Sequence, residues 1–161
     1  MPTRSPGFTL IELIVSVAIL AIIVSVGIAG FISFQDDQQV LSATKELQQL
    51  FVNAQVKARV KETPSTCGTG TLNGYKITRT NEVFTLTADC ATPVVRDSVS
   101  LTGYTVSGGL ASGGSILFKT QFDSTITPTK ICIQKGTVYY GFSISGQGQV
   151  SDVERGDATC P

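Results

Sequence analysis

Two residues near the start of the chain, Gly7 and Glu12, have types and positions that could support chemistry. Gly7 offers a peptidase an unhindered backbone, and Pro6 biases Ser5 toward an extended conformation. Because an apolar stretch follows Gly7, cleavage there leaves that stretch on a mature chain that begins at Phe8. Glu12 places a carboxylate in the first turn of the stretch, where a charge is costly unless it has a partner or a function. We therefore expect processing after Gly7 and a specific contact at Glu12.

An uncharged stretch from Leu13 to Phe34 must position these two residues. A helix of about 20 apolar residues spans a bilayer core, so the stretch is long enough to cross a membrane. Arg4, on the short N-terminal side, predicts a cytoplasmic N-terminus and export of the rest. We expect residues 1–7 to be a leader peptide and residues 8–35 the transmembrane half of a long helix. The plainer alternative is a signal anchor whose glutamate only lies at headgroup depth, where a helix N-terminus favours negative charge.

The helix is expected to continue over residues 36–62 and to end near Lys61. No proline occurs between Phe8 and Glu62, and apolar residues recur at spacings of three and four, which is typical of an amphipathic helix. The predicted buried residues are Val40, Ala43, Leu47, Leu50, Phe51, Ala54 and Ala58. The predicted polar face carries Gln38, Lys45, Gln48, Gln49, Asn53 and Gln55. Basic residues suit the negative end of the helix dipole, and those near the predicted end are Lys57, Arg59 and Lys61.

Residues 63–161 have the texture of a β domain. Runs rich in β-branched and aromatic residues predict strands, and Asn81-Glu82 could make a tight turn between the first two. A glycine-rich segment over residues 108–114 predicts a loop. The expected strands are Tyr75 to Thr80, Val83 to Ala88, Val94 to Leu101, Tyr104 to Ser107, Ser115 to Lys119, Lys130 to Gln134, Tyr139 to Ser145 and Gln149 to Val153.

Four cysteines, Cys67, Cys90, Cys132 and Cys160, all follow the apolar stretch. An even number without any Cys-x-x-Cys pair predicts two disulfides in an oxidising compartment. We favour Cys67 with Cys90, which brackets one hairpin, and Cys132 with Cys160, which pins the tail. A zinc site is the alternative, but structural zinc sites usually take ligands in close pairs, and the chain has no histidine.

The stretch Gly7-Phe8-Thr9-Leu10-Ile11-Glu12, followed by an apolar helix, resembles the class III signal of type IV pilins and type II secretion pseudopilins. The resemblance implies cleavage between Gly7 and Phe8 by a prepilin peptidase and N-methylation of Phe8. It also implies that Glu12 pairs with the terminal amine of a neighbouring filament subunit. Gly27 and Gly30 lie inside the helix and either allow close helix packing or let the helix loosen during assembly. Many major pilins have a proline where this chain has Ala29, and this departure argues against helix melting and favours a minor or pseudopilin-type subunit.

The order of the later elements resembles the GspH/FimT-type minor pseudopilins, with a helix ending in basic residues, then Thr63 to Cys67, then strands. It implies a pilin-like α+β fold, in which a long N-terminal helix with a transmembrane first half packs on an antiparallel β-sheet domain. DNA-uptake members carry an arginine-bearing Gly-Arg motif near the C-terminus. This chain has Gly146-Gln147-Gly148-Gln149 there, which argues against direct DNA binding.

The composition argues against catalysis. Without histidine, a serine or cysteine nucleophile has no histidine base, and no pattern brings two carboxylates into one cleft. Twelve basic residues balance 12 acidic ones, so no overall field favours nucleic acid. A calcium site is an alternative to solvated loop charges for Asp123, Asp152, Glu154 and Asp157, although their spacing matches no EF-hand loop. We predict that the protein is not an enzyme and has no cofactor and no metal.

The expected function is a structural subunit, a minor pilin or pseudopilin, of a type IV pilus or type II secretion filament. The expected partners are sister subunits, the prepilin peptidase and methylase, an inner-membrane assembly platform and the lipid bilayer. The chain is expected as a single-pass inner-membrane protein before it enters a periplasmic or extracellular filament. The alternative is a binding module at a filament tip, for example one that captures DNA, with Lys57, Arg59 and Lys61 as its basic cluster.

Overall fold

The computed structural model describes residues 7–67, 71–120 and 126–156, although for residues 25–30 it describes the backbone alone. A helix, α1 (Leu10–Arg59), is followed by a short 3-10 helix (Ser65–Cys67) and then by strands. The chain divides into two compact units, Met1–Asp36 and Asp37–Pro161. The second unit contains the end of α1 together with every strand of the described residues.

The part of α1 within the second unit buries one face. Val40, Ala43, Leu47, Leu50, Phe51, Ala54 and Ala58 are all buried, which confirms the stripe predicted from their spacing. The helix begins at Leu10 rather than Phe8 and ends at Arg59 rather than Lys61. Lys61 takes a positive φ of 53°, and the N–H groups of Lys61 and Glu62 donate to the carbonyls of Ala58 and Lys57. These two bonds form a Schellman motif, in which the residue with positive φ is usually glycine.

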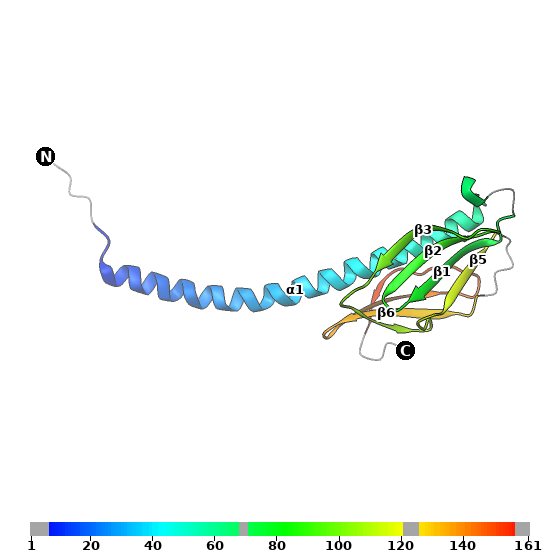
Figure 1. Ribbon diagram of the computed structural model, residues 1–161. Coiled ribbons are helices and arrows are strands. Elements are labelled where there is room, and N and C mark those ends of the chain that lie inside the picture. Colours follow the sequence, from blue (N-terminus) through cyan, green and yellow to red (C-terminus); the bar gives the residue numbers. More distant parts are fainter. Residues whose placement is uncertain (1–6, 68–70, 121–125, 157–161) are drawn as a thin grey trace. The chain divides into compact units, whose positions relative to one another are not determined.

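The strands form two antiparallel sheets. Sheet A has the order β3-β2-β1-β5, and its strands are β1 (Gly74–Thr80), β2 (Val83–Asp89), β3 (Val94–Ser100) and β5 (Ser115–Lys119). Sheet B has the order β4-β6-β7-β8, and its strands are β4 (Thr105–Gly108), β6 (Thr129–Lys135), β7 (Val138–Ile144) and β8 (Glu154–Arg155). Figure 1 shows β1, β2, β3 and β5 side by side. The α+β fold, a helix packed on antiparallel sheets, agrees with the predicted class, but the sequence does not predict the division into two sheets.

The tight turn between β1 and β2 is confirmed. Asn81 takes a φ of 55°, and Thr80 pairs with Val83 across the turn. Asparagine tolerates this left-handed conformation better than most residues, so the turn is encoded locally. The glycine-rich segment connects β4 to β5 as a loop, as expected, except that Gly108 is the last residue of β4.

The last predicted strand, Gln149 to Val153, is wrong. There the structure has an isolated bridge between Ile144 and Val150, and β8 begins only at Glu154. The physical reason lies in side-chain bonding, because the Ser151 hydroxyl accepts the N–H of Ser143 in place of a backbone carbonyl. This bond interrupts the ladder beside β7.

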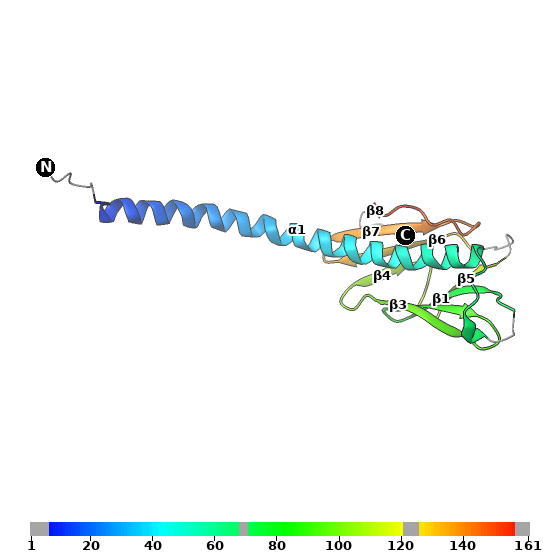
Figure 2. The ribbon, with the colours of Figure 1, turned by 90° about the horizontal axis from the view of Figure 1, so that it is seen from above.

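Phe51 joins the helix to both sheets. Its ring packs edge-on against Phe84 and Phe118 of sheet A, at centroid distances of 6.4 and 6.3 Å, and against Phe142 of sheet B at 5.5 Å. Figure 2 shows this end of α1 crossing in front of the strands, with β7 and β8 on one side of it and β1 and β3 on the other. Edge-to-face packing is a favourable arrangement for aromatic rings. One helical side chain therefore holds the centre of the core.

Candidate functional site

The predicted cleavage site lies just before the helix. Gly7 to Thr9 are not helical, and the Thr9 carbonyl accepts the N–H groups of Glu12 and Leu13, which starts α1. Phe8 is 79% exposed. A Cβ added to Gly7 would meet no atom within 4 Å, so the chain's own fold does not require glycine there.

Glu12 lies in the first helical turn and is exposed. Its backbone carbonyl accepts the hydroxyl of Ser16 at 2.7 Å, but its carboxylate has no partner among the residues that the structure describes. The apolar side chains around it are also exposed, among them Leu10, Ile11, Leu13 and Ile14. A negative charge is favourable at a helix N-terminus, but within the described residues this carboxylate has no opposite charge beside it.

The middle of the apolar stretch is only partly described. Gly27, Ala29 and Gly30 belong to residues 25–30, whose side chains lie outside the described part, so the two roles considered for these glycines stay open. Among the residues that the structure does describe, no helix combines the length and the apolar character needed to cross a membrane.

One predicted disulfide is present. Cys67 and Cys90 are bonded, with 5.8 Å between their Cα atoms, which confirms this pairing and excludes a zinc site that uses their thiolates. No cysteine in the described ranges is free. The predicted bond between Cys132 and Cys160 stays a prediction, because Cys160 lies outside the described residues.

The basic cluster at the end of α1 is partly neutralised. Lys57 Nζ lies 2.7 Å from Glu62 Oε2, and Arg96 of β3 lies 3.3 Å from Glu62 Oε1. The hydrogen bond from Lys57, aided by the two positive charges, lowers the pKa of Glu62 from its ordinary value of 4.5. The Tyr75 hydroxyl donates to the Glu62 carbonyl at 2.6 Å, and burial raises the pKa of this tyrosine. Lys57 is thus held in an ion pair at the end of α1. The predicted basic cluster of three residues therefore has one cation fewer available to bind nucleic acid.

Three polar residues of α1 bind sheet B and the segment between β7 and β8. Asp37 accepts the Tyr140 hydroxyl at 3.0 Å and lies 3.2 Å from Arg155 Nη2. Burial, followed by the bond to Asp37, raises the pKa of Tyr140. Gln48 donates to the Ser151 carbonyl at 2.7 Å, and Gln55 donates to the Gly148 carbonyl at 2.6 Å. The prediction that Gln48 and Gln55 lie on a polar face opposite the buried stripe misses these contacts, because no periodicity reveals where a distant carbonyl will lie.

Arg79 was also missed by the sequence reasoning. Its guanidinium donates to the carbonyls of Leu110 and Val106, and it lies 5.7 Å from the centre of the Phe84 ring. These contacts fix the glycine-rich loop to sheet A. Arg79 stands between Thr78 and Thr80 and shares its strand face with Ile77, and this alternation is the signal that could have marked it as facing the core.

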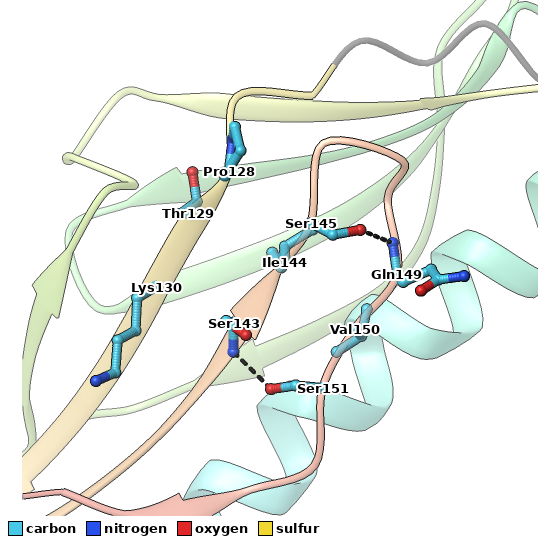
Figure 3. Close-up of a pocket in the computed structure, with 9 residues that line it drawn as sticks. All are labelled: Pro128, Thr129, Lys130, Ser143, Ile144, Ser145, Gln149, Val150 and Ser151. Carbon is cyan, nitrogen blue, oxygen red and sulfur yellow. Dashed lines mark hydrogen bonds between the residues drawn. The ribbon is translucent and has the colours of Figure 1, made fainter.

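A shallow groove borders β6, β7 and the segment after them (Figure 3). Its hydroxyls serve the fold, since Ser145 Oγ accepts the N–H of Gln149 at 3.0 Å and Ser151 Oγ accepts the N–H of Ser143 at 2.9 Å. Lys130 is the only titratable side chain among the groove residues in Figure 3, so the groove holds no acid–base pair. The described residues contain no group of three His, Cys, Asp or Glu side chains that could hold a metal ion, and Asp123 and Asp157 of the calcium alternative lie outside them.

The comparisons with known proteins bear on the N-terminus alone. Residues 3–28 match the family described as the prokaryotic N-terminal methylation motif. No curated protein and no solved structure matches the chain. The matched residues include Gly7, Phe8 and Glu12, and the motif indicates a pilin-like subunit that is processed by prepilin peptidase and assembled into filaments. Residues 3–28 of the chain therefore carry the N-terminal methylation motif, which is the hallmark of type IV pilins and pseudopilins.

Proposed function

We propose that the protein is a minor pilin or pseudopilin that a type IV pilus or type II secretion apparatus incorporates into its filament. Cleavage between Gly7 and Phe8 releases the leader, and Phe8 then receives its N-methyl group. Before assembly, residues 8–35 anchor the subunit in the inner membrane with the N-terminus in the cytoplasm. This anchorage rests on the uncharged sequence from Leu13 to Phe34.

The observation that carries the proposal is the unpaired carboxylate of Glu12. An ionised group within an apolar helix is expensive unless a partner neutralises it. The described chain offers no cation to this carboxylate, whereas the new amine of Phe8 on a neighbouring subunit is a cation generated by the cleavage itself. Pairing of the two groups would make assembly depend on processing and would fix the register between subunits.

The Glu12→Gln variant tests this contact. It keeps the shape of the side chain and removes its charge, so we expect normal cleavage and a tenfold or larger loss of incorporation into sheared filaments. Glu46→Gln is the matched control, because Glu46 is an exposed glutamate of the same helix. Normal incorporation of Glu12→Gln would show that the charge pair is not required.

Gly7→Val separates the processing step from the fold. Added atoms at Gly7 meet no part of the described chain, so the folded domain should be unaffected. We expect the variant to keep its leader and to stay in the membrane fraction. Cleavage of this variant at the normal rate would refute the role of Gly7.

The tip-binding alternative for DNA receives less support from the geometry. Lys57 and Arg96 both pair with Glu62, and the C-terminal turn presents Gln147 and Gln149 where DNA-uptake members carry arginine. Phosphate recognition needs several uncompensated cations. We therefore do not assign nucleic acid as a partner.

A further inference from the structure

The outer face of sheet A carries one row of hydroxyl side chains that crosses all four strands. Ser98 of β3 lies opposite Thr85 of β2, Thr85 opposite Thr78 of β1, and Thr78 opposite Ser115 of β5. Neighbouring strands are about 4.8 Å apart, so the row extends over about 14 Å. We call these four residues the hydroxyl row.

The row points away from the core. Side chains alternate between the two faces of a strand, and the residues next to the row, Ile77, Phe84, Leu86, Val99 and Ile116, are all buried. Ser98 and Ser115 are exposed, and the two threonines between them are half-buried by their neighbours on the same face. The four strands can be followed side by side in Figure 1.

The four hydroxyls are not used by the fold. Within the described residues none of them makes a side-chain hydrogen bond, and the one bond at Ser98 comes from its backbone N–H to Asp97. The groove of Figure 3 differs, because its serines accept backbone N–H groups and so hold a turn. The hydroxyl row is therefore available to a ligand.

The surroundings of the row are close to neutral. In the next row Lys76 stands opposite Thr87 and Leu117, and its amine lies 3.7 Å from Asp89. Val83 of β2 and Val95 of β3 are exposed beside the hydroxyl row. A nucleic acid needs several uncompensated cations, which this face lacks.

We propose that the outer face of sheet A binds an uncharged polysaccharide. The sugar hydroxyls exchange hydrogen bonds with the hydroxyl row, and the exposed valines contact the apolar C–H faces of the rings. A polymer suits the site better than a single sugar, because a row of equivalent groups without an enclosing pocket gains affinity from repeated contacts along one chain.

The test is co-sedimentation of the detergent-solubilised full chain with microcrystalline cellulose and with chitin. We expect the Thr78→Val/Thr85→Val variant to bind at least tenfold more weakly to the polymer that the unchanged chain prefers. Valine keeps the branched shape and the strand preference of threonine, so the sheet should persist. Thr105→Val, at an exposed threonine of β4 in sheet B, is the matched control and should bind normally.

Three results would overturn the proposal. The unchanged chain could fail to co-sediment with either polymer, the double variant could bind as tightly as the unchanged chain, or Thr105→Val could lose as much binding. A change in self-association of the double variant in sedimentation velocity would instead identify a contact between copies. If circular dichroism shows that the double variant is unfolded, Ser98→Ala/Ser115→Ala at the ends of the row replaces it, with the same tenfold loss expected.

Discussion

The two halves of α1 are equally helical but differ in what covers their apolar side chains. In the first unit Leu13 and Leu20 are each 60% exposed, whereas in the second unit Leu47 and Leu50 are at most 1% exposed. The second half has a polar face and an apolar face, and its apolar face packs on the two sheets. The first half has no polar face. An apolar surface of this extent marks a contact with something outside the folded chain. On the proposed function, the exposed half meets lipid or sister subunits, whereas the buried half stabilises the domain.

The largest effect is expected from a substitution at the centre of the buried half. Phe51→Ala removes a fully buried ring that contacts three other aromatic rings, so we expect the free energy of unfolding to fall by about 3–5 kcal/mol. Chemical denaturation followed by circular dichroism measures it. Leu20→Ala, in the exposed half, should leave the domain transition unchanged. Equal losses in both variants would contradict the contrast between the halves.

The disulfide beyond the helix end is expected to matter nearly as much. Cys67 and Cys90 are 23 residues apart, and closing a loop of this size restricts the unfolded chain by about 3 kcal/mol. A Cys67→Ser/Cys90→Ser variant should lose this amount in denaturation under oxidising conditions. Under reducing conditions its difference from the unchanged chain should shrink. A difference that persists at full size in reductant would show that the effect is not due to the crosslink.

A smaller effect is expected when two glutamines on the polar face of α1 are compared. Gln55→Ala removes the bond to the Gly148 carbonyl and should lower the free energy of unfolding by about 1 kcal/mol. Gln49→Ala, at an exposed glutamine of the same face, should stay within about 0.5 kcal/mol of the unchanged chain. If the two substitutions cost the same, the bond to the C-terminal turn contributes nothing to stability.

The smallest effect concerns acid. The hydrogen bond from Lys57 lowers the pKa of Glu62, so the folded state binds this proton less readily than the unfolded state. The stabilisation is therefore present above the unfolded pKa, near 4.5, and is lost as pH falls through the lower folded pKa. Denaturation at a series of pH values should show a shallower acid limb for Glu62→Gln. An unchanged slope would show that the ion pair contributes no pH dependence.

Local patterns predicted the helix well. Every apolar position of the predicted stripe is buried, since a helix period of 3.6 residues fixes which side chains share a face. Strand composition and the Asn81 turn also predicted sheet A closely. The predicted strand at Gln149 is only an isolated bridge, because the N–H groups of Ser143 and Gln149 donate to the hydroxyls of Ser151 and Ser145 and so interrupt the backbone pairing with β7.

Apart from the Cys67–Cys90 disulfide, contacts between distant parts of the chain could not be predicted. Glutamines on a helix surface are ordinarily solvated, and only the tertiary fold brings Gly148 and Ser151 to Gln55 and Gln48. The same holds for the hydroxyl row, whose four residues come from four strands and align only through the sheet register. The N-terminus differs, because the roles predicted for Gly7 and Glu12 follow from the local sequence and require no tertiary contact.

Mass spectrometry of the mature N-terminus, on chain purified from cells that contain its prepilin peptidase, tests the central claim most directly. We expect a chain that begins at Phe8 with one added methyl group on its amine, and a Gly7→Val variant that retains the leader. A mature chain that still begins at Met1, or one cleaved after the apolar stretch, would contradict the claim.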